Sequence, residues 1–301
     1  MIRVLEAGLR STVQDAGRFG HLRSGVPSAG PADPFALAAA NVLVDNAADA
    51  AGLEIIGTPF RFTCDDRRMV AVTGRDASLV IRGRLDGWSS VFVRAGETVT
   101  VYGGERTRFA YLAISGGIAS APVLGSRATY VPAGLGGVLR AGDALPLGDA
   151  PAGPERAARI VAPAVYDGQV RAVVGPHVDR FETGALARFF SASFVVDPAS
   201  DRQGVRLGGP PIAPRAGELL TCGMVTGAVQ VPRGGAPIVL LADHQTTGGY
   251  PVIATVIGAD IGKVAQAMPG EALRFYRAER FEAVDALREE RRVLDRARVS
   301  A

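Results

Sequence analysis

Glycine and proline recur along this chain at short intervals and divide it into brief apolar runs. The 301 residues include 38 glycines and 19 prolines, which leaves little uninterrupted length for helices. Runs such as residues 69–72, 91–93 and 110–114 consist of residues that favour strands. Strands separated by turn residues about every 8 to 12 positions are typical of an all-β fold. We therefore expect a mainly β chain with a few short helices.

Three segments have helical patterns instead. Residues 35–44 place their large apolar side chains on one face, with Asp33 positioned to cap the helix and Pro34 at its first position. A short helix is expected over residues 259–268. A longer one is expected over residues 280–298, where a partial apolar stripe is surrounded by charged residues.

The length suggests either one large domain or two of ordinary size. Residues 146–165 are rich in alanine, proline, glycine and charge, so they are interpreted as a linker. The stretch from Gly96 to Tyr102 parallels the stretch from Gly270 to Tyr276, which favours two similar β-domains. The alternative is that Gly-Glu simply makes a good turn before a strand. The predicted divisions are a first β-domain over residues 1–150, a second over residues 151–279, and a charged helix over residues 280–301.

Several classes of protein are disfavoured by composition. No apolar run approaches the roughly 18 residues of a membrane span. The first six residues lack the apolar run of a signal peptide, so we expect a cytoplasmic protein with no membrane partner. The net charge of +3 comes without a basic stripe interleaved with aromatic residues, so no nucleic-acid partner is expected.

Metal and nucleotide motifs are also missing from the sequence. His21, His177 and His244 lack metal-ligand spacing, and no metal site is predicted. Cys64 and Cys222 lie far apart and are expected to be reduced thiols. Lys263, the single lysine, is not in a P-loop, so an ATP site is not visible in this sequence.

The segment with the most varied polar side chains is the connector between two apolar runs, residues 238–242 and 252–257. Residues 243–250 bring together one acid, one imidazole, one amide, two hydroxyls and one phenol around two glycines. Loops held by a rigid scaffold often carry function. The alternative is a hydrogen-bonded turn of a β-barrel.

Two further polar segments stand out. Asp201 and Arg202 precede an expected strand, where they could form a fixed ion pair or offer a guanidinium fork to a carboxylate or amide substrate. A plain surface turn is the alternative there. Residues 10–34 form a polar segment framed by glycines that could fold over a cleft.

Taken in order, these segments resemble the biotin-dependent carboxyltransferase-like proteins, a family that includes allophanate hydrolase subunit 2 and the C subunit of 5-oxoprolinase. The likeness covers residues 3 to about 277. The motifs that carry it are Thr12–Arg18, Gly25–Pro34, Asn41–Val44, Leu53–Glu54, Ser115–Ile118, Leu124–Arg127, Ser200–Gly204 and Leu241–Pro251. His244 stands where we expect arginine or another polar residue, and Gln203 stands where methionine is common.

The resemblance implies two cyclophilin-like β-barrel domains and a shorter partner encoded by a neighbouring gene, similar to allophanate hydrolase subunit 1 or the B subunit of 5-oxoprolinase. It implies an ATP-dependent 5-oxoprolinase that opens 5-oxoproline to glutamate together with a third subunit, with ATP as co-substrate of the complex. Related modules in urea carboxylase transfer a carboxyl group from carboxybiotin to urea, so biotin enters only if this chain is a carboxyltransferase. Both substrates are small amides. Some relatives are described as antagonists of a kinase inhibitor, which leaves a non-catalytic regulatory module as the alternative.

From these residues we predict one polar cleft for a small amide substrate. Asp243 is the expected general base, and Arg202 is expected to bind a carboxylate or a polarised carbonyl oxygen. Other side chains would bind and orient the substrate, and the segment from residue 12 to residue 33 would close the cleft. These expected binding residues are Gln230, Gln245, Thr246, Thr247, Gly248, Gly249, Tyr250, Asp201, Thr12, Gln14, Asp15 and Asp33.

Overall fold

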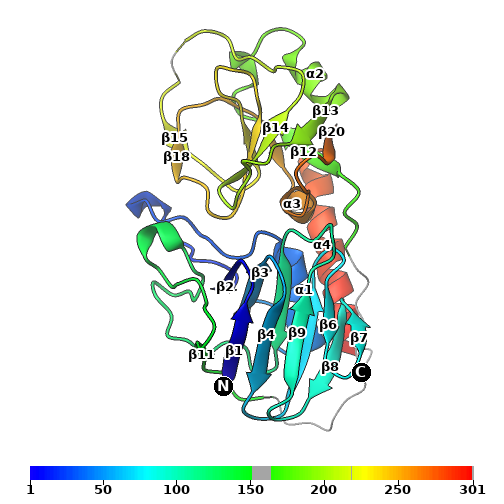
Figure 1. Cartoon of the computed structure of the whole chain (residues 1–301). Helices are drawn as coiled ribbons and strands as arrows, with labels where there is room; N and C mark the ends of the chain where they lie inside the picture. Colours follow the sequence, from blue (N-terminus) through cyan, green and yellow to red (C-terminus); the bar gives the residue numbers. More distant parts are fainter. Residues whose placement is uncertain (151–163, 218, 300–301) are drawn as a thin grey trace. The chain divides into compact units, whose positions relative to one another are not determined.

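A computed structural model of the chain describes residues 1–150, 164–217 and 219–299 (Figure 1). Most of the predicted linker, over residues 146–165, lies outside these described residues. The chain divides into two compact units, which we describe separately. The first unit comprises Met1–Arg18, Ala29–Ala164 and Glu290–Ala301; the second comprises Phe19–Ser28 and Val165–Glu289.

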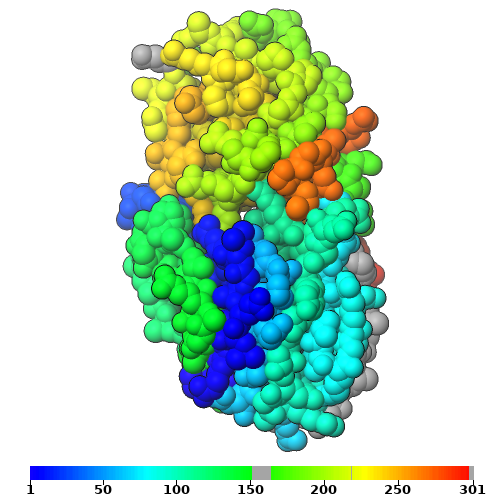
Figure 2. Space-filling view, in the orientation of Figure 1, coloured from blue at the N-terminus to red at the C-terminus, as the bar shows by residue number. Residues whose placement is uncertain are grey.

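The first unit contains two β-sheets. One has the strand order β11-β1-β4-β9-β6-β7 and the other the order β2-β3-β10-β5-β8. The strands are β1 (Ile2–Ala7), β2 (Arg10–Gln14), β3 (Gly52–Ile56), β4 (Phe60–Cys64), β5 (Arg68–Thr73), β6 (Ser78–Val80), β7 (Arg84–Asp86), β8 (Ser89–Val93), β9 (Thr98–Tyr102), β10 (Ala110–Ile114) and β11 (Ala144–Leu145). On the face seen in Figure 2, the dark-blue β1 lies beside the green segment that carries its antiparallel neighbour β11.

Strand alternation builds the core of this unit. In β4, Phe60, Phe62 and Cys64 are buried while Arg61 is exposed, as expected when side chains point to opposite faces in turn. The two phenylalanine rings belong to the same apolar cluster as Leu112 of β10, which is buried along its whole length.

Helix α1 (Pro34–Leu43) begins as the sequence predicts. The Ala36 N–H donates to Asp33 Oδ1 at 3.2 Å, and Pro34 occupies the first turn. The helix lies against β5 and β10. The Thr73 hydroxyl of β5 donates to the Ala36 carbonyl at 2.6 Å and fixes this contact. The predicted helix and its cap are confirmed.

The second unit is a closed barrel with the strand order β12-β19-β16-β17-β14-β13-β20. Its strands are β12 (Gln169–Val174), β13 (Ser193–Val196), β14 (Gly204–Gly208), β16 (Ala228–Gln230), β17 (Ile238–Leu240), β19 (Val252–Val256) and β20 (Ala272–Arg277). Parallel pairing between β12 and β20 closes the barrel. A separate ribbon pairs β15 (Cys222–Gly223) with β18 (Thr247–Gly248).

An aromatic cluster fills one part of the barrel. Phe189 of helix α2 (Ala185–Ser191) stacks on Phe275 of β20, with ring centroids 4.7 Å apart. Phe194 of β13 completes the group at 6.0 Å from Phe275. Buried residues alternate with more exposed ones along β13 and β20, as expected when successive side chains point to opposite faces.

The two parallel stretches found in the sequence have the same backbone role. Gly96 and Gly270 have φ values of 76° and 89°, which place both in the left-handed region that glycine adopts readily. Strands β9 and β20 follow directly. In both units, therefore, a Gly-Glu pair turns the chain into a strand.

The remaining helical segments are short except for the last. They are η1 (Leu22–Ser24), η2 (Val131–Ala133), η3 (Val178–Arg180), η4 (Gly258–Asp260), α3 (Ile261–Ala265) and α4 (Arg280–Val299). Helix α4 confirms the predicted charged helix. Helix α3 is shorter than the predicted 259–268, because the residue before Pro269 disfavours helical geometry and the Ala267 N–H already bonds the Val264 carbonyl in a tighter turn.

The mainly β fold predicted from the sequence is confirmed, with a closed barrel in the second unit and two sheets in the first. Within the described part of the chain, no helix combines the length and the apolarity that a membrane crossing requires.

Candidate functional site

The connector between β17 and β19, residues 241–251, is the polar segment singled out in the sequence, and we call it the central loop. Its middle, Thr247–Gly248, forms β18 of the two-stranded ribbon. A Cβ at Gly248 would lie 2.4 Å from Nε2 of Gln230, so a larger residue there would displace this buried amide. Thr246 helps to hold the ribbon through its carbonyl, which accepts the Met224 N–H at 3.0 Å.

Arg202 and Asp243 form a buried ion pair. Arg202 Nε donates to Asp243 Oδ2 and Nη2 donates to Oδ1, both at 2.8 Å, and each residue is only 4% exposed. The Asp243 N–H also donates to the Arg202 carbonyl at 2.9 Å. Two-pronged contacts of this kind are strong and fix orientation. The predicted base and the predicted guanidinium thus hold each other, across 41 positions of sequence.

Asp201 takes no part in that pair. It is exposed, and its Oδ1 accepts the N–H groups of Gln203 at 2.8 Å and Gly204 at 3.3 Å. These bonds shape the turn that leads into β14. Arg202 therefore forms its fixed ion pair with the distant Asp243 and not with the adjacent Asp201.

An amide network lies beneath the ribbon. The buried Gln230 donates from Nε2 to Met224 Sδ at 3.1 Å and to the Tyr250 carbonyl at 3.5 Å. Its Oε1 accepts a hydrogen bond from Nε2 of Gln245 at 2.7 Å. Two of the predicted orienting amides are therefore in direct contact, and Gln245 is the exposed member of the pair.

His244 lies between the ion pair and this network in sequence and is 1% exposed. Its Nδ1 is 2.7 Å from the Gln245 carbonyl oxygen, which can only accept, so Nδ1 carries the proton. Burial lowers the pKa of the imidazole, against smaller opposing effects of that hydrogen bond and of Asp243. The neutral ring therefore has its acceptor nitrogen at Nε2.

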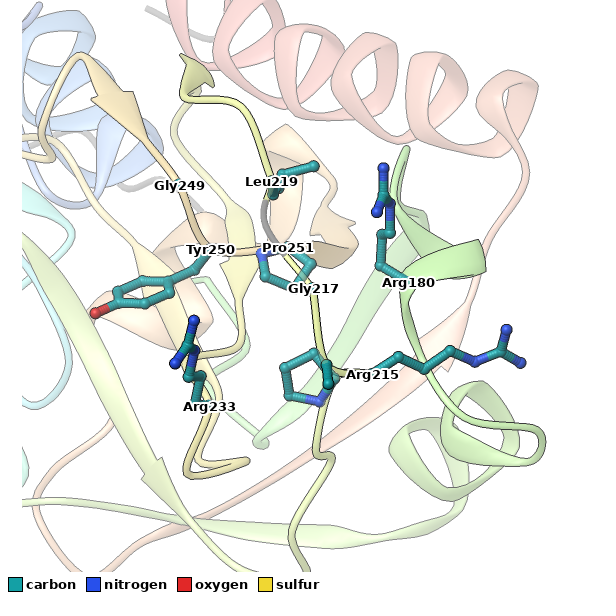
Figure 3. Close-up of a pocket in the computed structure, with 10 residues that line it drawn as sticks. Arg180, Arg215, Gly217, Leu219, Arg233, Gly249, Tyr250 and Pro251 are labelled. Carbon is teal, nitrogen blue, oxygen red and sulfur yellow. The ribbon is translucent and has the colours of Figure 1, made fainter.

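A pocket of about 530 Å³ opens at the end of the central loop (Figure 3). Gly249, Tyr250 and Pro251 form one wall of this pocket. Its other lining residues come from three separate turns and are Arg180, Pro214, Arg215, Ala216, Gly217, Leu219 and Arg233.

The sequence predictions missed all three arginines of this pocket. Arg215 and Arg233 each follow a proline and come two residues before a glycine, in Pro214–Gly217 and Pro232–Gly235. That repeated Pro-Arg-x-Gly pattern is the signal that could have drawn attention to them. Arg180 ends η3 and has no comparable signature.

The predicted site residues of the N-terminal segment belong to the first unit and are bonded within it. Gln14 Nε2 donates to the Thr12 hydroxyl at 3.1 Å and to the Thr129 carbonyl at 3.2 Å. Asp15 accepts hydrogen bonds from Ser126 and from the Arg127 N–H. Asp33 caps α1. These side chains hold loops and a helix together, and their predicted convergence with Asp243 in one cleft stays a prediction.

Neither cysteine is in a disulfide. Cys64 is buried, which raises the pKa of its thiol to about 11, and Cys222 contacts the Gly248 carbonyl at 3.8 Å from its sulfur. Among the residues that the structure describes, no group of three or more histidine, cysteine or acidic side chains could hold a metal ion.

Residues 24–277 match the family described as the carboxyltransferase domain, subdomain A and B. The chain belongs to this family. The C subunit of 5-oxoprolinase from Escherichia coli (strain K12) is 35% identical over 98% of this carboxyltransferase-family chain and 97% of its own length. A urea amidolyase of Saccharomyces cerevisiae is 29% identical over 91% of the chain, but only 16% of that protein is covered.

Solved structures give the same picture for this carboxyltransferase-family chain. The K. lactis urea amidolyase matches 98% of it with a TM-score of 0.88 and 27% identity, over 20% of the larger chain. The protein TTHA0988 matches 91% with a TM-score of 0.83 and 32% identity. The chain spans about half of TTHA0988, namely 55% of its length.

Proposed function

We propose that this chain is the C subunit of a multi-subunit 5-oxoprolinase, which opens the cyclic amide 5-oxoproline to glutamate. One observation carries the proposal: the C subunit of the Escherichia coli 5-oxoprolinase aligns with 98% of this chain and over 97% of its own length. Urea amidolyase, in contrast, contains a matching segment within a protein roughly six times longer, since 16% of it is covered. The C subunit is also more similar to this chain, at 35% identity against 29% for the urea amidolyase.

The reaction adds one water across the amide C–N bond of 5-oxoproline and yields glutamate. ATP is the proposed co-substrate of the complex and is hydrolysed to ADP and phosphate. The proposed partner is a protein encoded nearby that corresponds to the B subunit of 5-oxoprolinase. Small amide substrates match the donors and acceptors that the central loop presents.

Asp243 is the proposed proton acceptor. A carboxylate offers about four lone-pair positions, of which Arg202 uses two, so Asp243 keeps the capacity to accept a further hydrogen bond. Arg202 holds the carboxylate in one orientation. Gln230 and Gln245, which already bond each other at 2.7 Å, supply the amide and carbonyl groups that would align a planar substrate.

The test is production of glutamate from 5-oxoproline and ATP by the purified complex, with and without this chain. Asp243→Asn keeps the shape and removes the charge, so turnover should fall at least ~100-fold if Asp243 is the base. Asp197→Asn, an exposed acid elsewhere in the second unit, is the matched control and should leave turnover unchanged. Equal turnover without this chain would instead favour the non-catalytic regulatory module.

A second candidate is carboxyl transfer from carboxybiotin to an amide. The family description and the K. lactis structure favour it. It requires a biotinylated carrier supplied by another protein. Incorporation of labelled bicarbonate into urea by the complex plus such a carrier would support this candidate, and glutamate formation without biotin would oppose it.

A further inference from the structure

The pocket at the end of the central loop has an unusual charge pattern. Three of its ten described lining residues are arginines, and none of these ten carries a carboxylate. Arg180, Arg215 and Arg233 come from three different turns of the second unit, so folding rather than sequence proximity gathers them. A local excess of guanidinium groups favours anionic ligands.

Backbone hydrogen bonds hold these turns in place. The Arg215 N–H donates to the Arg180 carbonyl at 2.8 Å and joins two of the arginine-bearing segments. The third turn is closed by the Gly235 N–H, which donates to the Pro232 carbonyl at 2.9 Å. The Val231 N–H donates to the Pro251 carbonyl at 3.0 Å, which ties this turn to the central loop.

Figure 3 shows how the side chains are placed around this framework. Arg233 extends toward the phenol ring of Tyr250, and Arg180 stands on the other side of Pro251. Arg215 reaches outward from the same wall. The pocket thus has cationic groups on two sides and an aromatic ring beside one of them.

Acidic residues in the described part of the chain balance few of these charges. Among them, Arg180 pairs with the exposed Asp179, whose Oδ2 lies 3.7 Å from the arginine Nε. Over the described ranges, Arg215 and Arg233 make no ion pair. An exposed pair such as Asp179–Arg180 contributes little to stability, so an incoming oxyanion can replace it at small cost.

The pocket is also larger than one carboxylate needs. Its volume of about 530 Å³ lies within the roughly 300–1,000 Å³ of small-molecule sites. We propose that it binds a ligand through phosphate or carboxylate oxygens, with a polyphosphate as the best match to the guanidinium groups of Arg180 and Arg233 on its two sides. Tyr250 then provides a flat surface for a ring such as a nucleobase. This inference rests on the geometry of the second unit and stands apart from the proposed function.

The ligand would contact the same loop that carries Asp243. Tyr250 and Pro251 line the pocket, and the Tyr250 carbonyl accepts a hydrogen bond from Gln230, which also bonds Gln245. The pocket is therefore linked to the amide network by one hydrogen bond of 3.5 Å, from Gln230 Nε2 to the Tyr250 carbonyl. Binding there would be sensed by the central loop.

Calorimetric titration of the full chain tests the proposal directly. The probes are ATP, inorganic triphosphate, adenosine and 5-oxoproline, each titrated without the other subunits. Binding of ATP and triphosphate but not adenosine assigns phosphate as the ligand group. Binding of 5-oxoproline without triphosphate assigns the carboxylate instead.

Arg233→Ala and Arg180→Ala should each weaken binding of the anion by about tenfold or more, since each removes a charge-assisted hydrogen bond to it. Arg274→Ala is the matched control, because Arg274 is exposed on β20, three strands away from the β16–β17 turn of Arg233 in the barrel order. Its affinity should equal that of the unmodified chain. Arg233→Lys keeps the charge and guards against misfolding, and it should retain part of the affinity.

Two results would overturn the proposal. One is the absence of binding by any of the anionic probes. The other is equal affinity in the Arg180→Ala, Arg233→Ala and Arg274→Ala variants when all three melt at the same temperature as the unmodified chain. Because no turnover is measured, a complex inactive toward 5-oxoproline would leave this result untouched.

Discussion

Asp15 of the first unit and Asp243 of the second are both buried acids, with 9% and 4% of their surface exposed, but their charges are satisfied differently. Asp243 faces the guanidinium of Arg202 through two hydrogen bonds of 2.8 Å. Asp15 is bound only by neutral donors: Oδ1 accepts from Gly17 N–H at 3.0 Å and from the Ser126 hydroxyl at 2.5 Å, and Oδ2 accepts from Arg127 N–H at 2.6 Å.

An arginine also lies close to Asp15 in sequence, yet it acts elsewhere. Arg18 Nε donates to the Val123 carbonyl at 3.0 Å, and its Nη2 donates to the Ala128 carbonyl at 2.8 Å. Asp15 and Arg18 thus fasten the same loop from its N–H side and its carbonyl side. In the second unit an aspartate and an arginine therefore form an ion pair with each other. In the first unit an aspartate and an arginine instead bond separate backbone groups of one loop.

The largest expected effect comes from breaking the ion pair. Arg202→Met leaves Asp243 buried without a counter-charge and should lower the free energy of unfolding by about 3–5 kcal/mol. The double variant with Asp243→Leu removes both charges and should recover most of that loss. Urea unfolding followed by far-UV circular dichroism measures the free energy of unfolding of both variants.

Arg206→Met is the control for this prediction, because Arg206 is an exposed residue of the neighbouring strand β14. It should change stability by no more than about 0.5 kcal/mol. A double variant less stable than Arg202→Met alone would contradict the assignment of the loss to an unpaired charge.

Asp15→Asn tests the other arrangement. The amide side chain loses the negative charge that three donors share, and its NH₂ group faces donors where oxygen is needed. We expect a loss of about 2–3 kcal/mol. Trp88, the only tryptophan, is buried in the first unit and donates to the Gly74 carbonyl at 3.1 Å, so its fluorescence reports this unit. An unchanged fluorescence midpoint would mean that Asp15 does not order the loop.

Ser126→Ala removes one of the three donors to Asp15 and leaves the other two. The loss should be smaller, about 1 kcal/mol. It should not add fully to that of Asp15→Asn, because residues in one network are coupled. Simple additivity in the double variant, measured by the same fluorescence transition, would show that the two side chains act separately.

The smallest expected effect is on the pH dependence of stability, and it comes from His244, the neighbour of Asp243 in sequence. Burial lowers the pKa of His244, next to Asp243, below its ordinary value of 6.5. Below that pH the unfolded chain binds a proton that the folded imidazole resists, so the free energy of unfolding falls as the pH falls. His244→Gln should flatten this slope between pH 7 and 5. A slope identical in both proteins would assign it to other groups.

Much of the architecture could be predicted because local signals agree with the fold. Alternation in β4, the Asp33 cap of α1 and the charged pattern of α4 all depend on neighbouring residues. The two segments chosen for the site, around Arg202 and Asp243, do meet. What the sequence leaves open is the direction in which Arg202 points, because it lies in a turn where the Asp201 carboxylate accepts the N–H groups of Gln203 and Gly204 instead.

The arginine pocket could not be foreseen for a different reason. Arg180, Arg215 and Arg233 lie on turns whose proximity depends on barrel closure and on long-range backbone hydrogen bonds. No periodicity in sequence encodes such a meeting. The shared cleft between the N-terminal segment and the central loop depends in the same way on tertiary placement and stays a prediction.

The parallel pairing of β12 with β20 has a consequence for biosynthesis. These are the first and last barrel strands along the chain, and Val170 pairs with Phe275 between them. Until β20 has been synthesised, one edge of β12 has no partner strand, and its unpaired backbone groups can pair with the wrong strand. The barrel can therefore complete itself only after the ribosome has released residue 277, and a polypeptide that stops earlier would be a substrate for chaperones rather than a smaller version of the same domain.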